Sequence, residues 1–384
     1  MANLKLFYAT NRHHLGDDDL HPTGYGTKFS DDGMENLRFG SLTVKATDAQ
    51  INKCLKADVG PAGKGDGIKL SGYLSSCAES ASITAYPESI SKDIAEAAQK
   101  DAKLGSLAMF EDLMTVMSAC SDVLIYIHGF NVKWSEAVGG ALALQLMLNN
   151  SAVRDPAQNL TVVLFSWPSD GAALPWVSYK SDRTEAAGSG GAVGRAFLKA
   201  RDFLVGLRDQ AKVGGRQLCG QDIHLLCHSM GNYLLENALA RLYDFSPGNA
   251  LPRLFEHVFL CAPDLDDDAL EEGKPLGRID QVARNVTLYH NRNDKAMYIS
   301  DYTKGNPERL GHNGAAHPAQ LHNKIHQVDC TPAVSDITGH SYYLTGNING
   351  DIRQSIDGLD QEDPRRMRAR TGNLDHLWTF KVAS

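Results

Sequence analysis

Short apolar runs alternate with longer amphipathic stretches over most of the chain. The apolar runs predict buried strands, and each stops abruptly at small or polar residues: Val123–Ile127, Thr161–Phe165, Ile223–Leu226, Val258–Cys261 and Asn285–His290. The amphipathic stretches predict helices at Pro87–Ala119, at Trp134–Leu148 and at about Ser181–Gln210, the last interrupted by glycines. Strands alternating with helices are typical of a parallel sheet. Strands that are apolar throughout indicate that helices cover both of its faces.

The two flanks of this pattern are less regular. Leu4–Thr10 and Leu37–Val44 predict strands that form an N-terminal antiparallel edge of the sheet. Lys45–Ala85 carries scattered glycines and is expected to be loop. Lys324–Cys330 predicts a weaker strand, and the polar tail from residue 350 contains a local basic cluster at 364–368 that we expect to be solvated.

These elements together predict the fold class and the domain organisation. We expect an α/β fold with a mostly parallel central sheet, helices on both faces and the antiparallel N-terminal edge. We expect one domain over residues 1–384, within which residues 45–119 form an insertion of loop and helix whose role the sequence leaves open.

Composition and charge exclude several classes of function. The 384 residues are 42% hydrophobic and carry a formal net charge of −8 without a basic run, which argues against a nucleic-acid or anionic-membrane partner. No segment has the roughly 18 consecutive apolar residues of a transmembrane anchor, and the N-terminus lacks a secretory pattern, so we expect a cytoplasmic protein unless a leader was removed. Seven scattered cysteines form no C-x-x-C pair, so no metal site is predicted.

A serine stands where one of the apolar runs turns into a helix. The run Ile223–Leu226 is followed by Cys227-His228-Ser229-Met230-Gly231 and then by a helical apolar spacing at Leu234, Ala238 and Leu242. In this strand–turn–helix setting the pattern predicts a nucleophile elbow, in which a strained serine projects above the sheet. Gly231 meets the need for a small residue after the serine, whereas Cys227 stands where glycine is usual.

A serine hydroxyl needs a general base, and the base needs an acid that orients it. Asp294 follows the strand ending at His290 and is the predicted acid; Asp264, which follows the preceding strand, is the alternative. His340, after a glycine on the loop beyond the last strand, is the predicted base. The competing histidines lie in or before that strand, on the wrong side of it or packed within it: His312, His317, His322 and His326. His228 is expected to be structural.

Two backbone N–H groups are predicted to stabilise the negative charge that develops on the carbonyl oxygen. Met230 follows the serine and supplies one, and Phe130 supplies the other because it follows a strand that ends in His128 and Gly129. His128 and Gly129 are also expected beside the substrate. Further aromatic candidates for lining its pocket, with core packing as the alternative, are Trp167, Trp176 and Tyr179.

The order of these motifs resembles a poorly characterised, mostly bacterial branch of the α/β-hydrolase superfamily, esterase- and lipase-like hydrolases of unknown function. The motifs are FYATNR, HGFN, FSWPSDG, HSMGN, APDLDDD, YHNRND and GHSYY, and they extend from Phe7 to about Leu344. The resemblance implies the α/β-hydrolase fold, with Ser229 as nucleophile, Asp294 as acid and His340 as base. It does not explain Cys227 or the stretch 45–119, and it names no substrate.

The sequence therefore predicts a serine hydrolase that cleaves a small-molecule or lipid-like acyl ester through an acyl-enzyme, without a metal or organic cofactor. The same three residues could act on an amide, on a thioester or in acyl transfer, and the sequence does not separate these. A hydrolase-like binding module without activity is the alternative from another class. It predicts a broken triad, whereas all three candidate residues are present.

Overall fold

The structure is a computed structural model that describes residues 1–86, 105–117, 122–152, 159–169, 175–214, 221–246, 251–297, 308–334 and 339–381. For residues 175–178 and 206–214 it describes the backbone alone.

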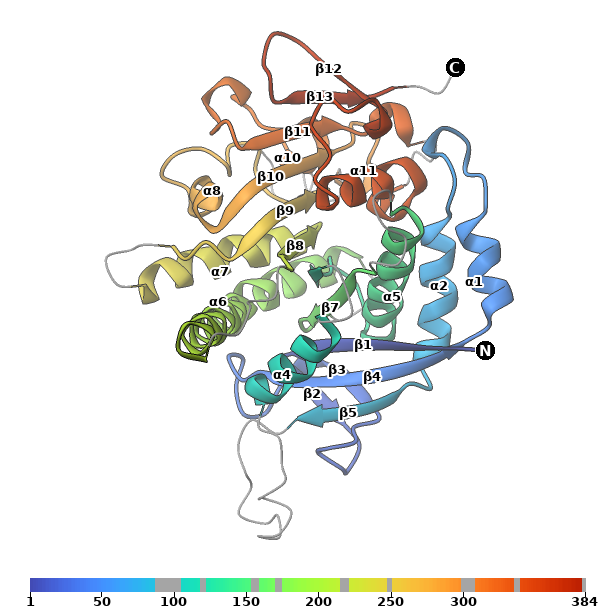
Figure 1. Cartoon of the computed structure of the whole chain (residues 1–384), viewed down its shortest axis with the longest axis vertical. Helices are drawn as coiled ribbons and strands as arrows, with labels where there is room; N and C mark the ends of the chain where they lie inside the picture. The colour runs from blue at the N-terminus through green and yellow to red at the C-terminus, as the bar shows by residue number, and fades with distance from the viewer. Residues whose placement is uncertain are drawn as a thin grey trace.

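Within the described residues, eleven strands form one sheet in the spatial order β12-β13-β11-β10-β9-β8-β6-β7-β1-β4-β5 (Figure 1). Its strands are β1 (Ala2–Thr10), β4 (Arg38–Ala46), β5 (Ser82–Tyr86), β6 (Val123–Ile127), β7 (Thr161–Ser166), β8 (Ile223–His228), β9 (Phe255–Cys261), β10 (Ala283–His290), β11 (Ile325–Asp329), β12 (Arg368–Arg370) and β13 (Leu377–Phe380). Neighbouring strands from β1 to β13 run parallel. The β1–β4 and β4–β5 pairs at one edge and the β12–β13 pair at the other are antiparallel. The predicted mostly parallel sheet with an antiparallel N-terminal edge is confirmed.

Helices cover both faces of this sheet (Figure 1). On one face lie α1 (Asp48–Leu55), α2 (Gly67–Ala78), α5 (Trp134–Asn150) and α11 (Gly346–Ile356). On the other lie α4 (Gly105–Met117), α6 (Pro175–Gly214), α7 (Met230–Phe245) and α8 (Ile279–Val282). A separate two-stranded sheet joins β2 (Arg12–Leu15) to β3 (Gly24–Phe29), and α10 (Leu310–Asn313) is a single turn beside β10. Short 3₁₀ turns occupy Gly60–Ala62, Pro275–Arg278, Pro318–Gln320, Thr331–Ala333, Tyr342–Leu344 and Pro364–Arg366.

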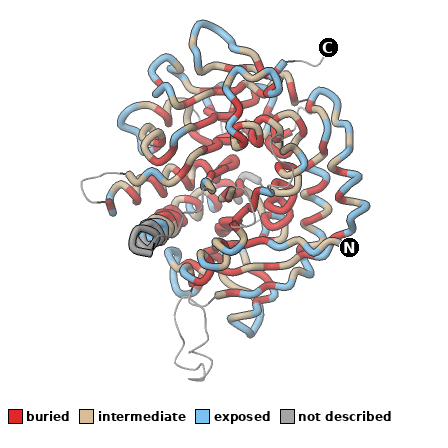
Figure 2. The backbone as a smooth tube through the Cα atoms, in the orientation of Figure 1, coloured by how far each residue is buried: buried red, intermediate tan, exposed pale blue. Residues whose placement is uncertain are grey.

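Alternate residues of each central strand enter two different apolar cores. In β6, Leu124 and Tyr126 pack in the core under α5, whereas Val123 and Ile127 pack in the core under α6 and α7. Figure 2 shows the buried residues gathered in the central strands and on the inner sides of the helices. Because both faces are buried, no strand position needs to be polar, and the strands read as continuous apolar runs.

The prediction of a loop over Lys45–Ala85 is wrong, because this segment contains α1, α2 and β5. Its glycines at 60, 63 and 65 lie between the two helices, and Gly67 is the first residue of α2. Asp66 caps α2 by accepting a hydrogen bond from the Lys69 N–H at 2.8 Å, which is a helix start signal that the glycines obscured.

The helix predicted at Trp134–Leu148 is confirmed as α5, whereas the other two predicted helices differ from the structure. Of the helix expected at Pro87–Ala119, residues 105–117 form α4, which packs on β4, β5 and α6; the rest lies outside the described residues. The described part therefore covers the N-terminal edge of the sheet. The helix expected at Ser181–Gln210 is longer, and its glycines do not interrupt it. A Cβ at Gly190 would come within 2.7 Å of Asn237 Cβ, so the small residue there allows α6 and α7 to approach closely.

The basic cluster at 364–368 was expected to be solvated, which is correct for the exposed Arg365 but wrong for Arg366 and Arg368. Arg366 and Arg368 are buried and pair with Asp351 of α11, which also accepts a hydrogen bond from the Tyr289 hydroxyl at 2.6 Å. Burial would raise the pKa of Asp351, but the two guanidinium groups hold it below its usual value. The charges therefore attach the C-terminal segment to β10, the strand that precedes Asp294.

The registers bring the polar strand ends to one edge of the sheet. Ile127 pairs with both Cys227 and Phe165, and Cys261 pairs with both His228 and Tyr289. The residues that follow these positions are therefore neighbours in space, as expected for the carboxyl ends of parallel strands.

Candidate active site

Ser229 sits in a strained turn between β8 and α7. Its backbone has φ 52° and ψ −124°, a conformation that a residue with a side chain rarely adopts. The Ser229 N–H donates to the Cys261 carbonyl at 2.9 Å, and the Ser229 carbonyl accepts from the Asn232 N–H at 3.0 Å and from the Asp264 N–H at 3.2 Å. The end of β9 and the first turn of α7 thus hold the serine, and a strained serine between a strand and a helix is the geometry of a nucleophile elbow.

Gly231 and Asn232, which follow the serine in α7, keep this turn tight. A Cβ on Gly231 would lie 2.6 Å from the His128 carbonyl oxygen and 2.8 Å from that of Ile127, so only glycine fits where α7 begins beside β6. The fully buried Asn232 donates its side-chain amide to the carbonyls of Cys227, Ser229 and Cys261. Sequence reasoning missed Asn232; the available signal was a polar residue one turn before Leu235 and two turns before Leu239, on the buried side of a helix.

Asp294 and His340 meet although they are far apart in the chain. His340 Nδ1 lies 2.7 Å from Asp294 Oδ2, and the Asp294 carboxylate is fully buried. The other carboxylate oxygen accepts from the Ala296 N–H at 3.0 Å, which fixes the orientation of the group. Because a carboxylate can only accept, Nδ1 carries the proton and Nε2 is left as the basic nitrogen.

His228 holds His340 from the side of the serine. Its Nε2 donates to the His340 carbonyl at 3.1 Å, and the two ring centroids are 4.7 Å apart. Burial, followed by the charge of His340, lowers the pKa of His228 well below its usual value, so this imidazole stays neutral. Its contacts agree with the structural role expected for it.

Ser229 and His340 are brought to the same edge of the sheet but are not bonded to each other. Among the described residues, no hydrogen bond joins the Ser229 hydroxyl to the His340 imidazole. Hydrogen bonds between a nucleophile and its base are often long in the absence of substrate and tighten only in the reacting complex.

The loop after β6 passes directly over the serine. A Cβ on Gly129 would lie 2.9 Å from Ser229 Cβ, so glycine permits this approach. The next residues use their N–H groups within the protein: Asn131 donates to Asp182 Oδ2 at 2.9 Å and Val132 to Ser169 Oγ at 3.0 Å. Among the described residues, the N–H of Phe130 has no hydrogen-bond acceptor. Met230 is the first residue of α7, and an N–H at that position has no partner within the helix.

The candidates for the pocket lining are placed differently from one another. His128 and Trp167 are fully buried, stack with ring centroids 5.2 Å apart, and are joined by a 2.9 Å hydrogen bond from Trp167 Nε1 to the His128 carbonyl, so both belong to the core. Tyr179 is buried too, with its ring edge on Phe130 and its hydroxyl donating to Asp264 at 2.8 Å. The side chain of Trp176 lies outside the described residues.

Asp264, the alternative acid, and the competing histidines have other partners. The Asp264 carboxylate faces Tyr179 and the buried Arg309, not His340. The ring nitrogens of the four competing histidines contact groups elsewhere in the described chain: His312 the Arg292 carbonyl, His317 the Glu271 carboxylate, His322 the Asp280 carboxylate and His326 the Trp378 indole.

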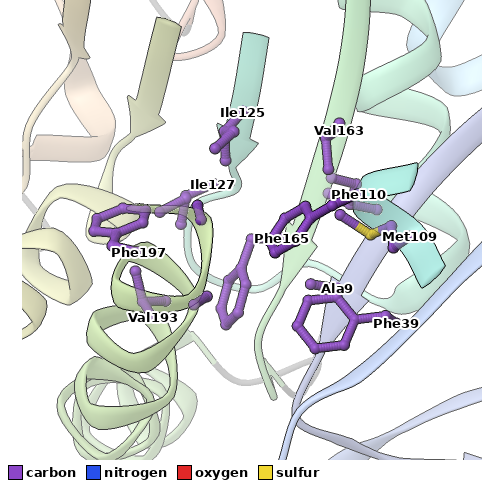
Figure 3. Close-up of a pocket in the computed structure, with 13 residues that line it drawn as sticks. Ala9, Phe39, Met109, Phe110, Ile125, Ile127, Val163, Phe165, Val193 and Phe197 are labelled. Carbon is purple, nitrogen blue, oxygen red and sulfur yellow. The ribbon is translucent and has the colours of Figure 1, made fainter. Parts of the chain in front are cut away.

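An apolar cavity lies on the face of the sheet under α4 and α6, and it encloses about 460 Å³ including the space open to solvent (Figure 3). Its lining is apolar: Ala9, Phe39, Met109, Phe110, Ile125, Ile127, Val163, Leu164, Phe165, Val193, Ala196, Phe197 and Ala200. None of the described lining residues is a candidate for the catalytic site. One of its lining residues, Ile127, lies beside the strand-to-helix turn, since a Cβ on Gly231 would be 3.2 Å from Ile127 Cγ2.

Within the described part of the chain, no three histidine, cysteine, aspartate or glutamate side chains are grouped to hold a metal ion. No helix described there combines the length and the hydrophobicity needed to cross a bilayer.

Two buried histidines predict that stability depends on pH. Burial lowers the pKa values of His128 and His257 from 6.5 to about 3. Between these values the unfolded chain binds protons that the folded chain does not, so this stability is present above pH 6.5 and is lost as the pH falls. Each histidine is expected to remove up to about 1.4 kcal/mol of unfolding free energy per pH unit.

Urea unfolding at several pH values between 7 and 5, above the range where most carboxylates titrate, measures this loss. His257 lies on β9 away from the serine, and His257→Gln is expected to make the dependence shallower. An unfolding free energy that is constant over this range, or an unchanged slope in the variant, would contradict the expectation.

Comparison with known proteins places residues 108–349 in the sequence model of a family described as alpha/beta hydrolases of unknown function (DUF900). No curated protein matches the chain significantly. Among solved structures, phospholipase PlaB from Legionella pneumophila in complex with thio-NAD is 15% identical, with 54% of this chain and 38% of that chain covered and a TM-score of 0.21. An acylaminoacyl peptidase from Pyrococcus horikoshii is 11% identical, with 62% and 37% covered and a TM-score of 0.25. The chain thus spans less than half the length of either protein, and similarity at this level leaves the substrate open.

Proposed function

The chain belongs to this family of alpha/beta hydrolases of unknown function, and from that premise we propose that it is a serine hydrolase that cleaves carboxylic esters through Ser229, His340 and Asp294. The observation that carries the proposal is the 2.7 Å contact between a fully buried carboxylate and the imidazole of His340, at the sheet edge that holds a serine in a strained turn. A buried charge is costly to keep unless it has partners, and orienting a general base accounts for this one.

In the proposed reaction, the Ser229 hydroxyl attacks the ester carbonyl and His340 Nε2 takes its proton. Asp294 keeps the proton of the imidazole on Nδ1 and stabilises the charged ring once it forms. The N–H groups of Phe130 and Met230 donate to the oxyanion. His340 returns the proton to the leaving alcohol, and an acyl-enzyme on Ser229 remains. Water activated by the same imidazole then hydrolyses it.

We further propose that the substrate is a small-molecule or lipid-like acyl ester. Such an ester requires only these groups. The same groups serve amide and thioester hydrolysis and acyl transfer, and no contact in the described residues favours one of these over an ester. A binding module without activity would have no need to orient an imidazole with a buried carboxylate, so it is the weaker alternative.

Rapid mixing with p-nitrophenyl acetate tests the proposal, followed by matched thioester and anilide substrates. The expected result is a burst of p-nitrophenol equal to the enzyme concentration or, where deacylation is fast, steady turnover of the ester above that of the anilide. Turnover of none of the three substrates would refute the hydrolase assignment. Turnover of the thioester alone would mean that the substrate is a thioester and not a carboxylic ester.

A further inference from the structure

Arg12, the first residue of β2, is a fully buried cation that contacts four separate segments. Its Nε donates to Ser166 Oγ at 2.9 Å, and one terminal nitrogen donates to the carbonyls of Gly26 at 2.9 Å and Ser169 at 3.2 Å. The other terminal nitrogen donates to the Val132 carbonyl at 2.8 Å. One guanidinium thus joins β3, the end of β7, the segment after β7 and the loop after β6.

The loop Gly129–Val132, called the oxyanion loop below, is held by hydrogen bonds to its backbone at both ends and in its middle. The Gly129 carbonyl lies 2.8 Å from His128 Nδ1, and the Val132 carbonyl accepts from Arg12. The N–H groups of Asn131 and Val132 donate to Asp182 and Ser169, and the Ser169 hydroxyl in turn donates to Asp182. Asn131 has φ 59°, so the loop is also strained at its centre. Among the described residues, the N–H groups of Gly129 and Phe130 are the backbone donors of this loop that have no acceptor, and Phe130 is the one predicted from the sequence to face the oxyanion.

The direction of each hydrogen bond follows from Arg12. A guanidinium can only donate, so Ser166 Oγ accepts from Arg12 Nε and can give its own proton to His128 Nε2, 3.1 Å away. A carbonyl can only accept, so His128 Nδ1 carries the proton that it donates to Gly129. Burial, and then the charge of Arg12, lowers the pKa of His128 to about 3, so the imidazole stays in this neutral form. The chain of donors therefore runs from Arg12 to both ends of the oxyanion loop.

We infer that Arg12 is a positioning residue that fixes the oxyanion loop so that the Phe130 N–H is in place for the transition state; this inference rests on the proposed function. A lysine cannot replace it, because an ammonium on a flexible stem does not span the planar fork of donors that reaches Ser166, Ser169 and Val132 at once. The Phe130 N–H is the group that contacts the substrate, and Arg12 acts only by positioning the loop that carries this N–H.

Arg12→Lys tests this inference when rates are expressed per active site. A fluorophosphonate probe, incubated to its end point, counts the competent serines, and ester turnover is divided by that count. We expect kcat and kcat/KM per site to fall by the same factor, on the order of 100-fold, as for the loss of one oxyanion donor. Binding of a trifluoromethyl ketone, which forms a tetrahedral oxyanion adduct, is expected to weaken by a similar factor. Ser169→Ala, which removes the acceptor of the Val132 N–H, is expected to act in the same direction.

Arg353→Lys is the matched control. Arg353 is a buried arginine of α11 whose guanidinium donates to Asp357 at 3.0 Å and Asn149 at 3.2 Å, so the change is chemically the same. It is expected to lower stability and the count of competent sites without changing kcat per site.

The outcomes separate the two proposals. If Arg12→Lys and Ser169→Ala reduce only the number of labelled sites and keep the rate per site and the affinity for the ketone, Arg12 is a stabilising residue and the inference is wrong. If the unaltered protein is neither labelled by the probe nor active on esters, the proposed function itself fails.

Discussion

Replacing Ser229 by alanine is expected to abolish ester hydrolysis while leaving the fold intact. The hydroxyl makes no hydrogen bond among the described residues, and the strained backbone is held by carbonyl and N–H groups that alanine keeps. The loss in kcat should be on the order of 10⁶-fold, because without the nucleophile no acyl-enzyme forms. Steady-state turnover of p-nitrophenyl acetate and a thermal unfolding curve measure the two parts of this expectation.

Ser246→Ala is the matched control for this variant. Ser246 lies just beyond the other end of α7, buried, and donates to the Leu242 carbonyl at 2.7 Å. Its replacement is expected to cost some stability, about 1 kcal/mol, and no turnover. Substantial hydrolysis by a folded Ser229→Ala protein would exclude the serine mechanism.

Asp294→Asn is expected to have the second largest effect, a fall in kcat on the order of 10⁴-fold. An asparagine side chain can present its NH₂ group to His340 Nδ1, which moves the ring proton to Nε2 and removes the base that faces the serine. Asp294 is fully buried and held by the Ala296 N–H, so the substituted side chain has little freedom to turn away. Turnover measured as a function of pH gives the size of this loss. Turnover measured with an added general base shows whether that base restores the activity.

The choice between the two candidate acids is tested by Asp264→Asn. Because Asp264 faces Tyr179 and Arg309 and has no contact with His340 among the described residues, its change should reduce kcat far less than that of Asp294. A larger loss for Asp264→Asn than for Asp294→Asn would assign the acid to Asp264 and overturn the geometry proposed here.

The sequence predicts the central architecture because the strands are buried on both faces. A run such as Val123–Ile127 has no polar position, so its length, its abrupt end and the helix that follows identify both the strand and the sheet edge that it reaches. The same signal located Ser229 between β8 and α7. It also placed Asp294 after β10, and the contact between Asp294 and His340 was predicted because both follow strand ends on that edge.

Other features depend on contacts that a one-dimensional pattern does not contain. The sequence does not indicate that Arg12 and Asn232 are buried, because charged and amide side chains are rarely buried; only the folded chain shows the carbonyls that surround them. The cluster around Arg366 is buried because Asp351 lies opposite, on a helix hidden in a polar stretch. His128 was expected beside the substrate because it follows a strand, but its imidazole points back into the Arg12 network.

The most direct test of the central claim is to locate the covalent adduct of a fluorophosphonate by peptide mass spectrometry, with and without competing ester. The account predicts a single modified peptide that contains the turn from β8 to α7, with the added mass on Ser229 and none in the Asp294→Asn protein at short times. An adduct on another residue, or an unmodified Ser229 in protein that hydrolyses esters, would contradict it.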